Sequence, residues 1–345
     1  MSIAEDVSES PSGDLEALEA IMARGGEQLR ELMGRAEAHL KQVTEDAGSP
    51  LACHANATVL AGGKRLRPLL VLLAAQAAGG PPDTPGGQES LVRAAVAVEL
   101  VHSATLVHDD VIDGATLRRG HPTVAAVAGR QVAVATGDLL FSRAFAELAR
   151  NGDIIQLEAL SSASSALAAG ELLQREDAYA THVAVERYLH RCELKTAALF
   201  EAACRLGALL AIEGSSALAE KLGAFARRIG LAFQLLDDVL DVSGSVQHTG
   251  KSRGTDLLDG TVTLPFILAR ERDPQLAAFD LRSLSNALQA EGLCDRIEAT
   301  GSLEKARERA LALVADAKEM LPKCLSGGRG ELLALVADAV VERYR

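Results

Sequence analysis

The sequence predicts an all-α protein with a single domain. Alanine and leucine dominate a chain of 345 residues that is 48% hydrophobic, and alternating runs of β-branched residues are scarce. Apolar positions recur at intervals of three and four residues across most of the chain, which is the period of an amphipathic helix. A chain of this length can bury one large core. We therefore expect one large helical bundle.

Glycine and proline mark where the helices end. Breakers lie at residues 48–50, 79–87, 119–122, 244–254, 273–274 and 326–328. None of these segments is long enough for an interdomain linker. We therefore expect residues 14–345 to form one domain, and the polar, aperiodic residues 1–13 to form a disordered tail. The stretch from Val124 to Asp138 is almost uncharged, which predicts a helix buried on all sides at the centre of the bundle.

Charge and cysteine content exclude several classes of protein. The chain has 35 basic and 47 acidic residues and a formal net charge of −12, so no basic face is available to displace counterions from nucleic acid. The five cysteines are scattered and never in C-x-x-C spacing. We therefore expect neither a disulfide framework nor a zinc site, and a cytoplasmic location. The N-terminus has no apolar signal segment and charges interrupt the later apolar runs, which indicates a soluble protein and is compatible with peripheral membrane contact.

Two acidic clusters with the same spacing follow apolar runs. Both have the pattern D-D-x-x-D, and their members are Asp109, Asp110 and Asp113, and Asp237, Asp238 and Asp241. On a helix the first and last of these acids are about 6 Å apart along the axis. Their oxygens can therefore share a cation, and without one the three carboxylates repel one another.

The acidic clusters favour a magnesium site. A single D-D-x-x-D fits a solvated acidic helix end equally well, but two such clusters with apolar neighbours favour metal sites at the rim of a core. Hard oxygen ligands without His or Cys point to Mg²⁺, which substrate phosphates usually complete. Two facing clusters would hold several Mg²⁺ ions around one diphosphate, which is an arrangement for ionising a diphosphate leaving group.

Cationic side chains occur close to the acidic clusters in sequence. The segment at 62–68 places three basic residues behind a glycine pair, as in a phosphate-binding loop that enters a helix. Arg118 and Arg119 follow the first cluster, where guanidinium groups can bind diphosphate oxygens in pairs. Taken alone, the segment at 62–68 is better explained as a solvated helix start, and His102 as a hydrogen-bonded core histidine. Further donors are Lys195, Thr196 and Lys251.

Taken in order, these motifs resemble the trans-isoprenyl diphosphate synthase family, also called polyprenyl synthetases. The resemblance covers the chain from about residue 55 to the C-terminus. It rests on the segments GGKRLRP (62–68), ELVHSATLVHDDVID (99–113), RRGHPT (118–123), GDLLF (137–141), GELLQ (170–174), YLHRCELKTAALF (188–200), FQLLDDVLD (233–241), GKSRGTDLLDG (250–260) and TLP (263–265).

The resemblance implies an all-α bundle around a deep central cavity, usually in a homodimer, with several Mg²⁺ ions per active site. It implies that all six aspartates of the two clusters hold the metal ions. The implied catalytic residues are Asp109, Asp110, Asp113, Asp237, Asp238 and Lys195. The residues matched to isopentenyl diphosphate binding are Lys64, Arg67, His102 and Arg119. Those matched to the allylic diphosphate and its metals are Arg118, Lys195, Thr196, Gln234 and Lys251.

The implied reaction is a Mg²⁺-dependent head-to-tail condensation of isopentenyl diphosphate with an allylic diphosphate. Metal ions and cationic side chains stabilise charge on the departing diphosphate, the isopentenyl double bond attacks the allylic cation, and a proton is lost. The released diphosphate is the expected base. One residue departs from the family pattern, because Thr261 stands where the family often has lysine, two residues before the TLP segment. We expect activity to persist, since all six aspartates remain.

Small residues before Asp109 predict the length of the product. In the family, bulky aromatic residues at the fourth or fifth position upstream stop chain growth, and here Thr105 and Ala104 occupy these positions, next to Ser103. We expect these residues to line the cavity below the metal site. The predicted product is therefore a long-chain all-trans polyprenyl diphosphate, with geranylgeranyl or farnesyl diphosphate as the alternative.

Two other classes of function share some of these features. A terpene cyclase also has an Asp-rich Mg²⁺ site, but generally keeps one D-D-x-x-D and needs aromatic walls around its carbocations. With 7 Phe, 3 Tyr and no Trp, this chain fits a condensing enzyme better. A regulatory subunit of a heteromeric prenyl synthase would be expected to have lost motif residues that this chain retains.

Overall fold

The computed structural model describes residues 13–45, 51–244, 253–325 and 328–342, without the side chains of 13–16 and 322–324. The prediction of a disordered tail falls almost entirely on residues 1–12, which lie outside the described residues, and Gly13 is the first residue of helix α1. Lys251 also lies outside them.

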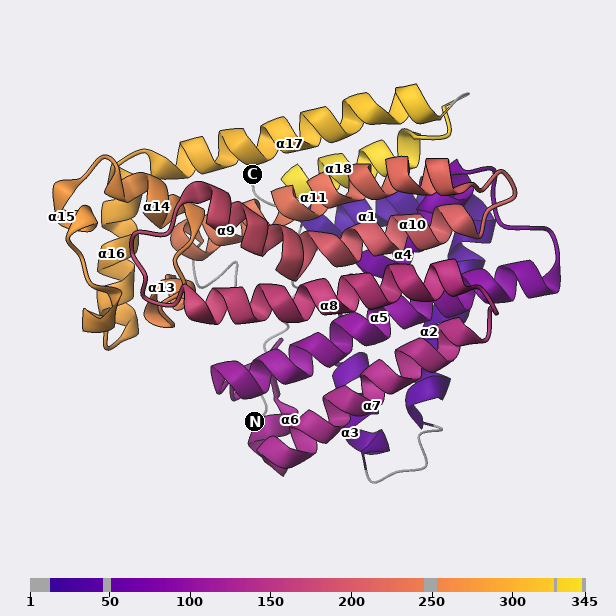
Figure 1. The fold of residues 1–345 in the computed structure, drawn as a ribbon, viewed down its shortest axis with the longest axis horizontal. Coiled ribbons are helices and arrows are strands. Elements are labelled where there is room, and N and C mark those ends of the chain that lie inside the picture. The colour runs from indigo at the N-terminus through magenta and orange to yellow at the C-terminus, as the bar shows by residue number, and fades with distance from the viewer. Residues whose placement is uncertain (1–12, 46–50, 245–252, 326–327, 343–345) are drawn as a thin grey trace, which may run out of the picture.

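The described chain is a bundle of helices, which confirms the all-α prediction (Figure 1). The N-terminal half contains α1 (Gly13–Arg24), α2 (Gly26–Glu45), α3 (Ala52–Leu60), α4 (Leu66–Ala77), α5 (Pro85–Asp113), α6 (Val124–Ala128), α7 (Arg130–Ala149) and α8 (Ile154–Glu176). The C-terminal half contains α9 (Val185–Cys192), the π-helical turn η1 (Glu193–Ala197), α10 (Ala198–Leu209), α11 (Ser216–Ser243), α13 (Thr255–Leu258), α14 (Leu264–Arg270), α15 (Pro274–Ala277), the 3₁₀ turn η2 (Leu281–Ser283), α16 (Ala287–Ala299), α17 (Ser302–Cys324) and α18 (Glu331–Glu342). Two short strands, β1 (Leu117–Arg118) and β2 (His121–Pro122), form an antiparallel hairpin after α5.

The long helices lie side by side along the long axis of the molecule. α17 runs along the edge opposite α7, and the short helices α13 to α16 gather at one end (Figure 1). α5 packs against α7, α4 and α2, and α10 packs against α11, α4 and α8. The core thus extends across the bundle as one body.

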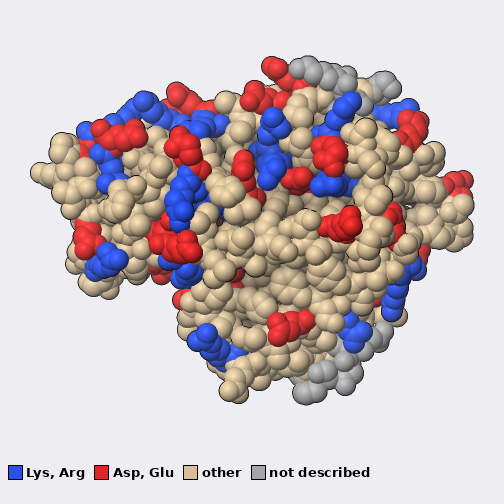
Figure 2. All heavy atoms as spheres, viewed as in Figure 1, with Lys and Arg blue, Asp and Glu red and all other residues tan. Residues whose placement is uncertain are grey.

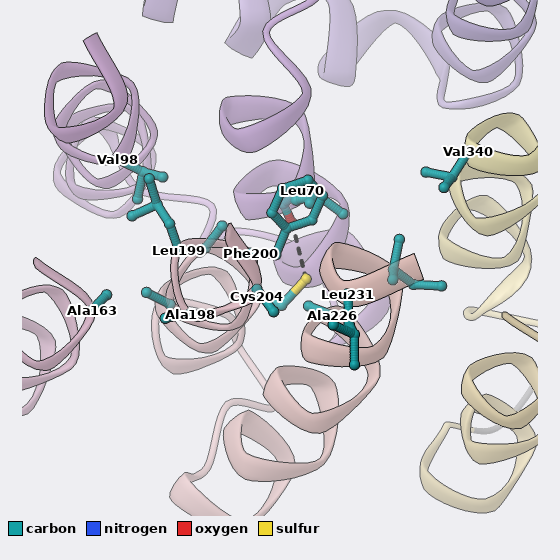
Figure 3. Packing of buried hydrophobic residues seen from close by; sticks show 14 of the residues in the cluster. Leu70, Val98, Ala163, Ala198, Leu199, Phe200, Cys204, Ala226, Leu231 and Val340 are labelled. Carbon is teal, nitrogen blue, oxygen red and sulfur yellow. Dashed lines mark hydrogen bonds between the residues drawn. The ribbon is translucent and has the colours of Figure 1, made fainter. Parts of the chain in front are cut away.

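The centre of the core is formed by α4, α5, α10 and α11. Figure 3 shows Phe200 and Cys204 of α10 between Leu70 of α4 and Ala226 of α11, with the Cys204 thiol 3.9 Å from the Leu70 carbonyl oxygen. α5 is long and apolar enough to cross a membrane, but 72% of its most apolar stretch is buried among the other helices. This burial is typical of the central helix of a bundle.

The prediction of a fully buried helix after Val124 is wrong. Gly129, with φ of 85°, separates α6 from α7, because this backbone conformation is open mainly to glycine. α7 buries one face against the core, while Val134 is 38% exposed and Val127 of α6 is 62% exposed. This stretch therefore has little charge because both its buried face and its exposed face are apolar.

Of the cysteines whose side chains the structure describes, Cys53 is exposed, and Cys192, Cys204 and Cys294 are buried; no disulfide bond joins these four. Burial raises the pKa of the Cys192 thiol to about 12, so it is neutral at physiological pH. The buried thiols act as small apolar side chains of the core.

Candidate active site

Both acidic clusters lie at the C-terminal ends of long helices. Asp113 is the last residue of α5 and precedes the cap Gly114, and the second cluster occupies the last two turns of α11, which ends at Ser243. The free carbonyl groups at a helix C-terminus carry partial negative charge, and neither helix has a basic residue in its last turn. Acids at these positions are destabilised unless cations from elsewhere compensate them.

The π-helical turn η1 connects the surroundings of the two clusters. Lys195 Nζ donates to Glu171 Oε2 of α8 at 2.5 Å, and the Lys195 charge acts on Asp109. The next residue, Thr196, donates from Oγ1 to Gln234 Oε1 of α11 at 2.6 Å. A π turn inserts one residue into a helix and often occurs at functional sites. Here the π turn directs Lys195 toward the surroundings of the first cluster and Thr196 toward those of the second.

Gly170 allows α8 to approach η1. A Cβ atom at Gly170 would lie 2.5 Å from the backbone nitrogen of Lys195 and 2.8 Å from its Cα. Because real Cβ atoms do not approach backbone so closely, a side chain here would push α8 away from η1. The glycine therefore brings Glu171 within reach of the Lys195 ammonium group.

The middle aspartate of each cluster has protein partners. Asp110 is 5% exposed and accepts a hydrogen bond from Arg118 Nε at 2.6 Å. Asp238 is 3% exposed, and its two carboxylate oxygens accept hydrogen bonds from the Tyr188 hydroxyl at 2.6 Å and from Gln234 Nε2 at 2.7 Å. The first and last aspartates of each cluster retain more accessible surface than these two, so they are better placed to face a ligand.

Burial and mutual repulsion raise the pKa values of several cluster carboxylates. Burial raises the pKa of Asp109 to about 6, and Glu171 and Asp113 add to this shift while Lys195 opposes it. Burial and the nearby Asp256 carboxylate raise the pKa values of Asp238 and Asp241. The Asp256 backbone N–H donates to Asp241 Oδ2 at 3.3 Å. These carboxylates lie where added positive charge would stabilise them.

The donor set fits magnesium bound jointly with a substrate. The ligands available are hard carboxylate oxygens at two helix ends, crowded enough to raise their pKa values. Within the described part of the chain, no three His, Cys, Asp or Glu residues converge to hold one metal ion by themselves. Mg²⁺ is usually bound by one or two carboxylates together with waters and substrate phosphates, which is the arrangement these residues permit.

Two arginines of the basic segment at 62–68, which enters α4, have different surroundings. Arg65 is fully engaged: Nε donates to Glu37 at 2.7 Å, Nη1 to the buried Glu99 at 2.8 Å, and Nη2 to the Val59 carbonyl oxygen at 2.7 Å. The Arg67 guanidinium instead lies 5.0 Å from the centre of the Phe200 ring, and its buried Nε has no hydrogen-bond partner among the described residues. Arg65 therefore stabilises the fold, while Arg67 retains donors for a ligand.

Arg67, His102 and Arg119 form a positive cluster beside α5. Burial and the nearby Arg67 and Arg119 charges hold the pKa of His102 well below its usual value. Burial likewise lowers the pKa of Arg67 to about 10, which leaves it protonated at neutral pH. Arg119 donates to the Gly62 carbonyl oxygen. The Arg119 charge also lowers the pKa of Arg67, so two cations beside a neutral imidazole form a site for an anion. Lys64, three residues before Arg67, is exposed.

The residues before Asp109 are not equally accessible. Ala104 is fully enclosed, whereas Thr105 retains accessible surface. Thr105 lies one turn before Asp109 on the same side of α5, while Ala104 shares its side with His108, which packs on α7 with Nε2 3.2 Å from the Val134 carbonyl oxygen. The expectation that both residues line the cavity is therefore corrected for Ala104, which faces α7.

Several residues at the site were not assigned a role from sequence. Glu171 and Arg175 on α8, Tyr188 on α9 and Asp256 on α13 all lie within or next to the quoted motifs. Their partners come from other helices, so spacing along the chain did not indicate them. The only local signal is the separation of four residues between Glu171 and Arg175, which predicts a pair on one face of a helix.

Known proteins resemble this chain in sequence and structure. A family model described as Polyprenyl synthetase matches residues 50–296. Heptaprenyl diphosphate synthase component 2 of Geobacillus stearothermophilus is 37% identical over 289 residues, covering 81% of this chain and 87% of that protein. Geranylgeranyl diphosphate synthase of Methanosarcina mazei is 36% identical over 288 residues, covering 82% of this chain and 86% of that protein.

A solved structure has the same fold. The crystal structure of a polyprenyl synthase from Caulobacter crescentus, complexed with calcium and isoprenyl diphosphate, superposes with a TM-score of 0.83 at 34% identity and covers 92% of this chain and 97% of that one. The motifs, the fold and these relatives agree. The chain belongs to the polyprenyl synthetase family and is a prenyltransferase.

Proposed function

We propose that the protein condenses isopentenyl diphosphate with an allylic diphosphate to make a long-chain all-trans polyprenyl diphosphate. The observation that carries the reaction is the pair of carboxylate clusters at two helix ends, with η1 beside both. The Lys195 charge acts on Asp109, and Thr196 binds Gln234, which donates to Asp238. The heptaprenyl relative supports a long product. The absence of a bulky side chain at Thr105, which retains accessible surface one turn before Asp109, supports it as well.

We infer that the metal ions are Mg²⁺, held by the first and last aspartates of each cluster. Bound Mg²⁺ would stabilise negative charge on the departing diphosphate. Asp110 and Asp238 orient the cluster through their protein partners. The calcium and isoprenyl diphosphate in the Caulobacter crescentus structure support a divalent cation beside a diphosphate in this fold.

We infer that the positive cluster of Arg67, His102 and Arg119, together with Lys64, binds the diphosphate of isopentenyl diphosphate. We assign the allylic diphosphate to the residues next to the two acidic clusters, which are Arg118, Lys195, Thr196 and Gln234. Thr261 stands where the family often has lysine. Its backbone N–H donates to the Asp256 carbonyl oxygen at 2.7 Å. This bond holds the loop beside the second cluster without adding a charge.

Product sizing tests the proposal directly. Purified protein incubated with farnesyl diphosphate, labelled isopentenyl diphosphate and Mg²⁺ should yield products longer than C20, resolved by chromatography. Products that stop at C20 or below would show that the long-chain assignment is wrong. Failure to consume isopentenyl diphosphate while the allylic substrate is ionised would instead indicate a cyclase.

The same assay addresses the need for a second subunit. The Geobacillus stearothermophilus relative is named component 2 of its synthase, so a partner chain is a specific alternative. We propose that this chain is catalytic by itself, because both acidic clusters are complete. Turnover by the isolated chain is the expected result, and inactivity of folded protein would support a heteromeric enzyme.

We propose that the chain forms a homodimer through the outer faces of α6 to α8. Val127, Val134, Ile154, Ile155 and Leu172 are large apolar residues exposed on these helices. In Figure 2 the charged side chains gather along the upper and left parts of the face, and its middle and lower part has fewer. Exposed apolar surface of this kind typically marks an interface. Sedimentation equilibrium should give twice the chain mass, 36.1 kDa for one chain, and a single-chain mass at micromolar concentration would contradict the proposal.

Cytoplasmic location and peripheral membrane contact stay predictions. Both follow from the sequence, and cell fractionation followed by a salt wash of the membrane fraction tests them together. Recovery of the protein as an integral membrane protein would contradict both.

A further inference from the structure

Arg175 connects two acidic groups of the site and has no role in the assignments above. It lies on α8, its Nη2 donates to Asp113 Oδ1 of α5, and its Nε donates to Glu171 Oε1 at 3.1 Å. The side chains of Arg175 and Asp113 are 36% and 34% exposed, so solvent and ions can reach the pair. The guanidinium thus contacts the last aspartate of the first cluster.

Glu171 holds Arg175 in place independently of Asp113. Its two carboxylate oxygens bind different cations, Oε1 accepting from Arg175 and Oε2 from Lys195. Burial alone would raise the pKa of Glu171, but the Lys195 and Arg175 charges hold it below its usual value. Glu171 is therefore an ionised anchor on which Arg175 can remain when its contact with Asp113 is broken.

Asp113 needs a positive partner because of its position. It ends α5, where the helix carbonyls are negative, and the carboxylate of Asp109 lies one turn before it. A divalent cation bound by Asp113 would share this carboxylate with the Arg175 guanidinium, whose positive charge would repel it. Arg175 and the metal therefore compete for the same carboxylate, and the arginine loses only one of its two contacts when the metal binds.

We infer that Arg175 is the resident counter-ion of Asp113 and that a divalent cation displaces it, so that Arg175 weakens metal uptake at the first cluster before a diphosphate is bound. The inference rests on the proposed function, because it assumes that Asp113 is a metal ligand. A partly exposed ion pair contributes little energy, so its removal should tighten metal binding by up to about fivefold.

Manganese binding in the absence of diphosphate tests the inference. Free Mn²⁺ is measured by electron paramagnetic resonance during titration of the wild-type protein and of Arg175→Gln, which removes the charge and keeps most of the side-chain length. We expect tighter Mn²⁺ binding by Arg175→Gln. The matched control is Arg187→Gln on α9, since Arg187 is 45% exposed and pairs with Asp177 at 2.6 Å and Glu176 at 3.2 Å, outside both clusters.

The outcomes separate the inference from the proposed function. If Arg175→Gln binds Mn²⁺ no more tightly than Arg187→Gln does, Arg175 does not compete with the metal and the inference is overturned. Asp113→Asn should weaken Mn²⁺ binding. If it has no effect, or if the wild-type protein binds no Mn²⁺, the metal is not held at Asp113, which overturns the metal assignment itself. Thermal unfolding without metal verifies that each variant is folded.

Discussion

Replacing Asp109 by alanine should reduce turnover by about three orders of magnitude or more. Asp109 lies in the last turn of α5, and burial raises its pKa to about 6. A buried carboxylate of this kind is costly without a cation and binds one strongly when it arrives. Loss of a metal contact to the departing diphosphate removes several kcal/mol of transition-state stabilisation, and each 1.36 kcal/mol is about tenfold in rate.

The fold should tolerate this change, which separates catalysis from stability. A carboxyl group whose pKa is raised in the folded state opposes folding when it is ionised, so at pH 7 its removal should leave the metal-free thermal stability unchanged or slightly higher. Steady-state kinetics at saturating Mg²⁺ measure turnover. Asp316→Ala, on the exposed side of α17, is the control and should retain full activity. Near-normal turnover by Asp109→Ala would overturn the metal assignment.

Replacing Thr105 by phenylalanine should shorten the product without abolishing turnover. Thr105 lies one turn, about 6 Å, before Asp109 on the same side of α5 and has accessible surface. A phenyl ring there would extend into the path of the growing chain directly below the metal site. The products of the wild-type protein and Thr105→Phe are compared by length under identical substrate ratios, and a long-chain distribution should change to C20 or shorter.

Two further variants isolate the role of side-chain size. Thr105→Val removes the hydroxyl that donates to the His102 carbonyl oxygen at 2.8 Å while keeping the shape, and should leave the product length unchanged. Ala104→Phe places the same ring in the enclosed position facing α7, where overpacking costs about 1–3 kcal/mol. We expect it to lower thermal stability. Partial unfolding lowers the amount of product and does not change its length. An unchanged product length in Thr105→Phe would therefore refute the steric explanation.

The site illustrates what local sequence can and cannot predict. The acidic clusters were predictable because the spacing of Asp109 and Asp113 has a meaning on any helix. The sequence also indicated Arg118 as a cation near the first cluster, but not its hydrogen bond to Asp110. It did not indicate Arg175, which reaches Asp113 from α8. The segment at 62–68 shows the same limit, since three basic residues looked alike in sequence and only the structure engages Arg65 with Glu37 and Glu99.

The fold shows a similar division. Periodicity predicted the helices, because a repeat of three and four residues has one geometric solution. It did not predict which helix lies at the centre: the uncharged stretch after Val124 pointed to α7, whereas α7 lies on the outside and α10 is buried. An apolar face has the same composition whether it packs on the core or is exposed at the surface.

By itself, the sequence determined the all-α class, the two carboxylate clusters and the family, because each depends on residue types at short, fixed spacings. Only the tertiary structure decided which aspartates of the clusters are buried, which arginine of the segment at 62–68 is bound to carboxylates, and which of Ala104 and Thr105 retains accessible surface. These outcomes depend on contacts between residues tens of positions apart, such as Arg175 with Asp113 and Tyr188 with Asp238. Burial and charge are properties of the packed bundle, so they are set only when the helices meet.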